Sequence, residues 1–242
     1  KDGGTDAGRL EIGSDLNLWR TASGLVGYWP FEGTGAISNG QTVGFTDSSG
    51  RNNNGTAYNT NGTGMSFVTG IIGNAIQFDG VDDNVSIPDN ASLNFGTSDF
   101  SVSAWIFYNG FYNQGSAWNM FIGKGSTQST GGDAFGLGTG SDNKARFMVR
   151  ETSNSTINNT GITDGEWHYI TAVRAGTTSK IYVDGNIGTD ITISGTVSNV
   201  FPLVIGRDST ATRCINGRVD DVRIYNRALS VSEIKAIYSA GK

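Results

Sequence analysis

The chain has 242 residues, with 36 glycines, 3 prolines and only 16% charged residues. It lacks both the strict Gly-X-Y repeat of a collagen and the run of about 18 apolar residues that a bilayer-spanning helix needs. The net charge of −5 argues against a nucleic-acid partner, because affinity for phosphates depends on an excess of Lys and Arg.

Residues 1–23 differ in pattern from the rest of the chain. They lack strand-like alternation, and Leu10, Leu16 and Trp19 are spaced nearly as on a helix, so we expect a short helix or an ordered arm here. The segment also lacks the apolar centre of a signal peptide. Because the chain starts with Lys rather than Met, we expect a processed or trimmed fragment, in which residues 1–23 are an N-terminal arm or the remnant of a stem. Residues 24–242 are predicted to form one domain.

From residue 25 onward, short segments alternate between apolar and polar residues and are separated by Gly, Asn and Ser. In residues 100–107, Val102, Ala104 and Ile106 are opposed by serines on the other face. About a dozen such strands predict an all-β fold, a two-sheet antiparallel sandwich of the jelly-roll type. The predicted strands cover 25–31, 75–80, 83–88, 100–107, 118–125, 133–139, 145–151, 166–174, 179–186, 190–195, 203–207 and 217–226.

One α-helix is predicted, in the C-terminal segment LSVSEIKAIYSAGK. Ser230 is a suitable N-cap, and Glu233 three residues later completes a capping box. Ile234 and Ile237 belong to an apolar stripe, and Gly241 can end the helix. We expect this helix to pack against an edge or rim of a sheet.

Seven segments, taken together and in chain order, resemble a known family of domains. They are GLVGYWPFEGTG (24–35), DSSGRNNNGT (47–56), GNAIQFDGVDDNVSIPD (73–89), FSVSAWIF (100–107), DGEWHYITAVR (164–174), IYVDG (181–185) and GRVDDVRIYNRALSVSEIKAIY (217–238). The pattern is similar to the laminin-G-like, concanavalin A-like jelly rolls of bacterial surface and secreted proteins, from residue 24 to the end of the chain. The resemblance implies two packed antiparallel sheets, one of them concave, and a bound structural calcium ion. For some members it also implies a carbohydrate or another ligand on the concave face or the rim loops.

The segment DSSGRNNNGT offers oxygen ligands of the kind that calcium takes. Asp47 supplies a carboxylate, and the glycines and asparagines let backbone carbonyls turn inward. Asp220 shares strand parity with apolar neighbours, and a carboxylate on a buried face needs a partner. The resemblance implies that four residues converge on calcium: Asp47, the backbone of Gly50 and Asn53, and Asp220. The alternative is that Asp47 makes an Asx-turn, while Asp220 pairs with Arg223 or a backbone amide.

The turn FDGVDDNVSIP carries three aspartates, Asp79, Asp82 and Asp83. They allow a second cation site, or an acidic rim beside a binding face. Asp and Gly are also the residues favoured in tight hairpin turns, and this structural interpretation is the one that we prefer from the sequence.

The sequence lacks the motifs expected of an enzyme on this fold. His168 is the only histidine, and it lies at the predicted start of a strand, where we expect packing or a backbone hydrogen bond. Glycoside hydrolysis needs paired carboxylates, and the Glu-X-Asp-X-X-Glu strand of the bacterial β-glucanases with this fold does not occur. We therefore predict a protein without catalytic residues.

The best candidates for ligand binding are aromatic residues in the segment IFYNGFYNQGSAWN (106–119). Phe111, Tyr112 and Trp118 lie there among Asn and Gly, in a region predicted to be a long loop. Exposed aromatic rings bind sugars by stacking, and apolar residues on loops often serve binding. Packing of the loop against itself is the alternative, and the sequence does not separate the two.

Three functions fit these observations. The first is a non-catalytic extracellular or cell-surface module, braced by structural calcium, that binds a glycan or another cell-surface ligand. The second is a structural or adhesive headgroup of a pilin-like surface filament, with self-association in the filament, because DAGRLEIGSDLNLWRTASGLVGYW (6–29) resembles the junction in pilin-like proteins that carry such a head. The third and weakest is a glycan-active enzyme. We expect no nucleic-acid partner and no insertion of this fragment into a membrane.

Overall fold

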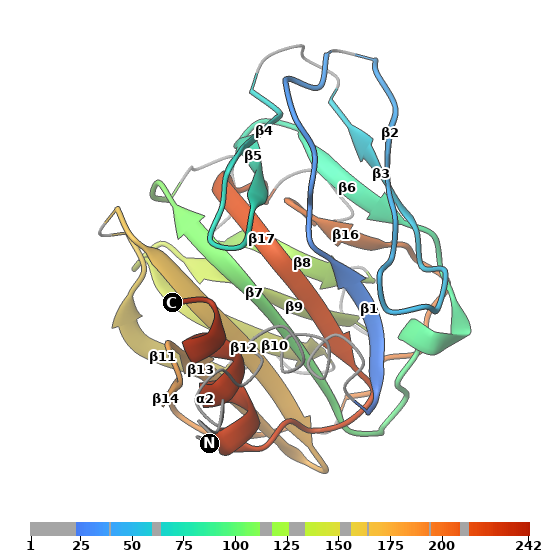
Figure 1. Cartoon of the computed structure of the whole chain (residues 1–242). Coiled ribbons are helices and arrows are strands. Elements are labelled where there is room, and N and C mark those ends of the chain that lie inside the picture. The colour runs from blue at the N-terminus through green and yellow to red at the C-terminus, as the bar shows by residue number, and fades with distance from the viewer. Residues whose placement is uncertain are drawn as a thin grey trace, which may run out of the picture.

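The computed structural model describes residues 23–38, 40–59, 64–111, 118–125, 134–150, 156–163, 165–193, 195–208 and 213–242. Apart from Ser23, the predicted N-terminal arm (1–23) lies outside the described residues. The described strands form two sheets that pack face to face, and every pair of neighbouring strands is antiparallel (Figure 1). This architecture confirms the predicted all-β sandwich.

In the described part of the chain, the first sheet has nine strands in the order β14-β13-β12-β7-β17-β5-β4, with β1 paired to β17 and β15 to β13. Its strands are β1 (Leu25–Trp29), β4 (Ser66–Thr69), β5 (Asn74–Asp79), β7 (Phe100–Tyr108), β12 (Trp167–Ala175), β13 (Thr178–Val183), β14 (Asn186–Ile187), β15 (Ile191–Thr192) and β17 (Asn216–Tyr225).

The second sheet has eight described strands in the order β11-β10-β9-β8-β16-β6-β3-β2. Its strands are β2 (Val43–Phe45), β3 (Gly55–Tyr58), β6 (Asn84–Ile87), β8 (Trp118–Lys124), β9 (Ala134–Gly140), β10 (Lys144–Arg150), β11 (Thr156–Gly161) and β16 (Leu203–Ile205). The described helices are the short 3-10 helix η1 (Ala91–Leu93) and the α-helix α2 (Val231–Ala240).

The main hydrophobic core lies between the two sheets. Alternation in β7 sends Val102, Ala104 and Ile106 into it, as predicted, and all three are fully buried. Phe100 of the first sheet meets Phe147 of the second with ring centroids 5.9 Å apart, so aromatic rings join the two layers. Burial of these apolar side chains is the main stabilising term of the sandwich.

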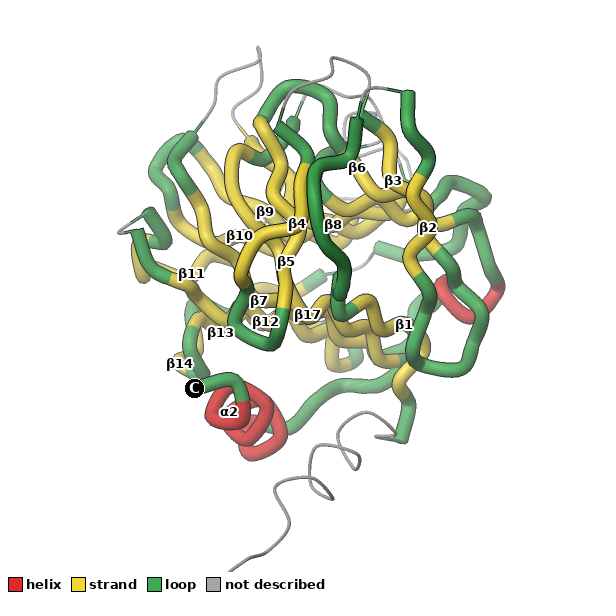
Figure 2. The backbone as a smooth tube through the Cα atoms, turned by 45° about the horizontal axis from the view of Figure 1, so that its top comes forward, coloured by secondary structure: helices red, strands yellow, loops and turns green. Residues whose placement is uncertain are grey.

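The predicted C-terminal helix is confirmed, but its place differs from the expectation. Ser230 Oγ accepts the N–H of Glu233, and Glu233 Oε2 accepts the N–H of Ser230, which completes the capping box. The helix covers the outer face of the first sheet rather than an edge or rim (Figure 2). The reason is a second apolar cluster on that face, where Ile234 and Ile237 pack with Trp105 of β7. No helix in the described part of the chain is long and apolar enough to cross a membrane.

Five of the described strands were not predicted as separate strands: β2, β3, β4, β11 and β14, the last because a turn divides the predicted strand 179–186 into β13 and β14. Their sequences, such as GTAY and TINNTG, are rich in Gly, Thr and Asn and lack a clear alternation of apolar residues. They form because neighbouring strands offer free backbone groups: β2 pairs with β3, β3 with β6, β4 with β5, and β11 with β10.

Candidate functional site

The predicted binding aromatics belong to one end of the sandwich. In the second sheet, Trp118 at the start of β8 pairs with Gly140 at the end of β9. Three strands away from β8, Tyr58 at the end of β3 pairs with Asn84 at the start of β6. Because paired strands run antiparallel, these strand ends lie on the same side of the sheet. We call this end the Trp118 rim and define it by Tyr58, Trp118, Gly140 and the turns 79–84 and 141–143.

Trp118 carries an ordered basic group. Its side chain is half-buried, and the guanidinium carbon of Arg146 on β10 lies 5.5 Å from the centroid of its ring, within cation–π distance. Asp142 pairs with Arg146, and the hydrogen bond from Arg146 lowers the pKa of the Asp142 carboxyl. The rim therefore places an aromatic ring, a guanidinium and a carboxylate side by side.

The sequence of β9 explains why Arg146 can reach Trp118. Alternation in AFGLGTG sends Phe135 and Leu137 into the core and leaves only glycines at the following outward positions. A β-carbon added at Gly140 would lie 2.5 Å from Arg146 Nε. The missing side chain on β9 thus makes room for the arginine to lie across the strand.

The structure describes two of the three predicted binding aromatics. Trp118 is the first residue of β8, and Phe111 is half-buried just after β7, while Tyr112 lies outside the described residues. Sequence reasoning missed Tyr58, whose side chain is 46% exposed on the face opposite the core residue Ala57. The signal was present in GTAYN, where an aromatic residue alternates with a small one.

The three predicted aspartates of the rim come together in the turn between β5 and β6. One ligand oxygen from each of Asp79, Asp82 and Asp83 lies within 4.8 Å of the others, the only such group of three or more His, Cys, Asp or Glu among the described residues. Burial raises the pKa of the Asp83 carboxyl to about 7, and the Asp79 carboxylate contributes to the same shift. The turn geometry that we preferred from the sequence is present as well, because Asp79 Oδ1 accepts the N–H of Val81 at 2.8 Å.

Asp47 lies near the opposite end of β3 and forms the Asx-turn that was the alternative to calcium binding. Its Oδ1 accepts the N–H groups of Tyr28 and Ser49 at 2.9 and 2.8 Å. Its Oδ2 accepts the hydroxyl of Ser49 at 2.8 Å and the N–H of Asn53 at 3.0 Å. The carbonyl of Asn53 in turn accepts the indole N–H of Trp29 at 2.9 Å. Protein donors therefore already satisfy these oxygens.

Asp220 is fully buried at a bulge in β17 and contacts a different segment. Its Oδ2 accepts the N–H groups of Ile71 and Ile72 at 2.8 and 2.9 Å, which fixes the turn between β4 and β5. Burial raises the pKa of this carboxyl to about 7. Arg223 pairs with the neighbouring Asp221 at 2.9 Å, so of the two alternative partners of Asp220 the backbone amides are the ones observed.

Of the four predicted calcium ligands, Asp47 and Asn53 are hydrogen-bonded within one loop, while Asp220 contacts a different segment. Gly50 adopts a left-handed φ of +81°, which allows the chain to turn in the loop after Asp47. Asp220 Oδ1 is buried and makes no hydrogen bond, whereas both oxygens of Asp47 accept protein donors. A calcium ion held jointly by Asp47, Gly50, Asn53 and Asp220 stays a prediction.

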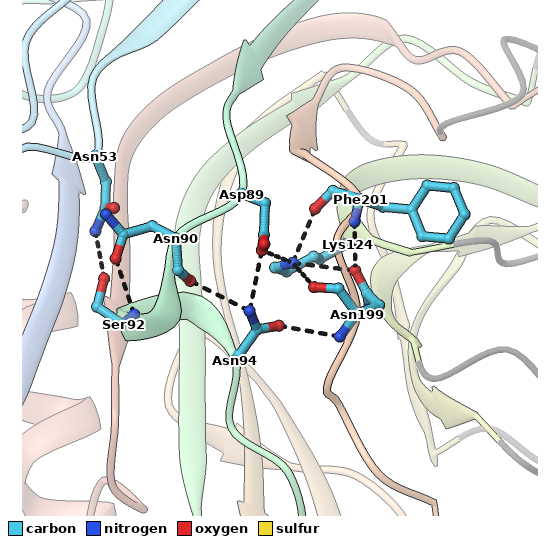
Figure 3. A network of polar contacts seen from close by, with 8 residues as sticks. All are labelled: Asn53, Asp89, Asn90, Ser92, Asn94, Lys124, Asn199 and Phe201. Atoms are coloured by element: carbon cyan, nitrogen blue, oxygen red, sulfur yellow. Dashed lines mark hydrogen bonds and ion pairs between the residues drawn. The ribbon is translucent and has the colours of Figure 1, made fainter.

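A lysine supplies a buried positive charge at the same end of the sandwich as the Asp47 loop. Lys124 is 0% exposed, and its ammonium donates to Asp89 Oδ1 at 2.7 Å and to the Phe201 carbonyl at 2.8 Å. It also donates to the carbonyl and the side-chain oxygen of Asn199, both at 3.0 Å. Figure 3 shows these contacts together with the hydrogen bond from Asn53 to the neighbouring helix η1. Four oxygens around one ammonium group hold the loops at this end together.

The His168 side chain contacts a carboxylate, whereas packing or a backbone hydrogen bond was expected from the sequence. Its Nδ1 lies 2.7 Å from Asp184 Oδ2, and Asp184 Oδ1 accepts the N–H of Tyr169 at 2.9 Å. The pair joins the start of β12 to the turn after β13.

A separate pocket of about 350 Å³, which we call the edge pocket, lies between β1 and β2 at the side of the sandwich. Trp29 and Phe31 line it but are 0% and 1% exposed, so neither ring presents an open face to a ligand. Stacking of a sugar ring is therefore better served at Trp118. The lining residues are Trp29, Pro30, Phe31, Glu32, Gly44, Phe45, Thr46 and Ser48.

Comparison with solved structures places this architecture among binding domains and enzymes. The chain is similar to the binding domain of Paraclostridial Mosquitocidal Protein 1, at 19% identity and a TM-score of 0.67, over 89% of this chain and 52% of that one. It is similar to domain 4 of AbnA, a GH43 extracellular arabinanase from Geobacillus stearothermophilus, solved in complex with arabinotriose, at 20% identity and a TM-score of 0.65, over 88% and 98% of the two chains. It is also similar to a Trypanosoma rangeli sialidase, at 18% identity and a TM-score of 0.64, over 89% of this chain but 32% of the sialidase.

These similarities show the fold. The chain spans about half of the mosquitocidal protein's chain and about a third of the sialidase. No curated protein sequence matches the chain. A family model described as the concanavalin A-like lectin/glucanases superfamily matches residues 79–235, which is more than half of the chain. That match confirms the resemblance seen in the sequence, and the chain belongs to the concanavalin A-like lectin/glucanases superfamily.

Proposed function

We propose that this chain is a non-catalytic carbohydrate-binding module and that glycan binds at the Trp118 rim. The observation that carries the proposal is the half-buried Trp118 with the Arg146 guanidinium 5.5 Å from its ring centroid. An aromatic ring takes the C–H face of a sugar, while neighbouring charged groups hydrogen-bond its hydroxyls. Arg146 and Asp142 stand beside the ring and offer both donors and acceptors.

The rim is ordered before a ligand arrives. Asp142 and the glycine position on β9 hold Arg146 in place, so little side-chain freedom remains to be lost on binding. Phe111 and the 46% exposed Tyr58 extend the aromatic surface on the same rim. Such a surface suits an oligosaccharide better than a single sugar, because several rings can each hold one unit.

The comparisons support a binding role over a catalytic one. Similar structures include toxin binding domains and an arabinanase domain solved with arabinotriose. The sialidase that the chain resembles is three times longer than the matched part. His168 is engaged in a structural pair with Asp184, which supports a role in the fold rather than in catalysis.

A secreted or cell-surface location, with a glycan or cell-surface partner, follows from this proposal. The calcium brace at Asp47 and Asp220 is kept as a separate proposal. The filament headgroup is the alternative function, and its distinguishing segment lies in residues 1–22, outside the described residues.

The test is a binding measurement by calorimetry with arabinotriose first and then a panel of plant, bacterial and animal glycans. For the glycan that binds, we expect Trp118→Ala to weaken affinity about 10-fold or more, as for a central aromatic anchor. The melting temperature should change little, because the ring is partly exposed.

Phe201→Ala is the matched control, because it also removes an exposed aromatic ring, 44% exposed in this case. Phe201 lies near the opposite end of β8 from Trp118, since its backbone carbonyl accepts a hydrogen bond from Lys124. This variant should leave the affinity unchanged. Equal affinity of the Trp118→Ala variant and the native protein, or no binding across the panel, would overturn the proposal.

A further inference from the structure

The Trp118 rim carries a group of carboxylates that the glycan proposal does not use. Asp79 ends β5 in the first sheet, and Asp82 and Asp83 precede β6 in the second, so the turn joins the two layers. Three negative groups whose ligand oxygens lie within 4.8 Å of one another repel each other strongly unless a positive charge or a proton stands between them.

Asp83 is the member that most needs a partner. The residue is 1% exposed, and its Oδ2 accepts the N–H of Asp79 at 3.1 Å. Its Oδ1 is buried and makes no hydrogen bond. A buried carboxylate oxygen without a donor is unfavourable, so this atom calls for a ligand that the protein itself does not supply.

At two other buried aspartates of the chain, protein groups interact with the negative charge. Asp221 pairs with Arg223 at 2.9 Å, and Asp47 accepts four protein donors. The groups that act on Asp83 are instead its own burial, one backbone amide, and the carboxylates of Asp79 and Asp82. Asp220 also keeps one buried oxygen without a donor, but its Oδ2 accepts two backbone N–H groups, whereas Asp83 has one such donor and two neighbouring carboxylates.

Contacts that do not involve Asp83 Oδ1 hold the turn in shape. Cys214 Sγ donates to the carbonyl of Val81 at 3.1 Å, and Asp79 pairs in the β-ladder with Asn216 of β17. The carboxylates can thus serve a ligand while the backbone of the turn stays fixed.

We propose that Asp79, Asp82 and Asp83 bind a divalent metal ion, and that the ion links the end of β5 to the start of β6. A set of carboxylate oxygens with no sulfur or imidazole favours a hard cation such as Ca²⁺, with water completing its coordination. The site is distinct from the one predicted at Asp47 and Asp220, and it does not depend on glycan binding.

The experiment is a thermal melt of the full chain, stripped with EDTA and then titrated with Ca²⁺. A ligand that binds only the folded state at 100 times its Kd should raise the melting temperature of a chain this size by about 5–10 °C. We expect Asp83→Asn to abolish this rise, because the amide can still accept the N–H of Asp79 but carries no charge. Asp82→Asn, at a half-buried position, gives a second variant if Asp83→Asn does not fold.

Two control variants separate the proposal from its alternatives. Asp190→Asn removes one charge from a side chain that is 43% exposed, far along the chain on the β14–β15 connection, and should keep the full Ca²⁺ response. Asp47→Asn should keep the part of the response that Asp83→Asn removes, so that an ion at the predicted Asp47 loop is read separately. A response lost in Asp47→Asn but kept in Asp83→Asn and Asp82→Asn would move the ion to the Asp47 loop and overturn the proposal. So would a stripped native protein whose melting temperature Ca²⁺ does not change. None of these outcomes depends on whether a glycan binds.

Discussion

At the scale of single residues, the side chains that fix the loops are buried polar groups whose partners are distant in the sequence. Lys124 is the clearest case, since its acceptors come from residues 89, 199 and 201. The sequence placed Lys124 near the end of a predicted strand but did not indicate which groups its ammonium contacts. Asp47 was predictable as a key loop residue, because an aspartate followed by Ser, Gly and Asn favours an Asx-turn. Its contact with Tyr28 was not, because that contact depends on how β1 lies against the loop.

The Lys124 network gives a stability prediction. Lys124→Met should lower the free energy of unfolding by about 3 kcal/mol, because it removes the buried ammonium and leaves Asp89 and the carbonyls of Asn199 and Phe201 without their donor (Figure 3). Urea unfolding measures the change. Lys180→Met is the control, since Lys180 is 33% exposed and lies 3.5 Å from Asp190, and it should cost about 0.5 kcal/mol or less. Equal losses in the two variants would contradict this account of Lys124.

At the scale of elements, local signals predicted what depends on local contacts. Helix α2 was predictable with its cap and its end, because the capping box and the apolar stripe lie within its own sequence. Its position on the outer face was not, because the apolar patch under it comes from β7, β12 and β17. In strand β9 the local signal and the tertiary contact disagree. Its glycines weaken a strand locally, but Gly140 leaves room for the Arg146 side chain.

The start of α2 gives a prediction of pH dependence. Hydrogen bonds from Arg227 lower the pKa of Glu233 from 4.5 to about 2. A carboxylate with a depressed folded-state pKa stabilises the fold above its unfolded pKa and loses that effect as pH falls. The native protein should therefore be more stable than Glu233→Gln by about 1 kcal/mol at neutral pH, and the difference should shrink between pH 4.5 and 2.

Urea unfolding at several pH values measures this difference. In an Arg227→Met background the same substitution should show a much weaker trend, because the main cause of the pKa shift has been removed. A difference that stays constant down to pH 2 would contradict the assignment.

At the scale of the whole molecule, antiparallel pairing collects residues from distant segments at one rim. Tyr58, Trp118 and Arg146 belong to three strands of the second sheet, and the turn with Asp83 connects that sheet to the first. The family pattern and the alternation of residue types predicted the fold class, while Trp118 and the acidic turn stay predictions as binding sites. The sequence could not predict that Arg146 reaches Trp118, or that the acidic turn shares a rim with it, since both follow from the strand order.

The most direct test of the central claim is a glycan titration followed through the indole N–H signals in NMR spectra of the full chain. Single Trp→Phe variants assign the signals. The account predicts that a binding glycan shifts the Trp118 signal and leaves those of Trp29 and Trp105 in place, because these two side chains are 0% and 1% exposed. A glycan that shifts the Trp29 signal and not that of Trp118 would place the ligand in the edge pocket and contradict the account.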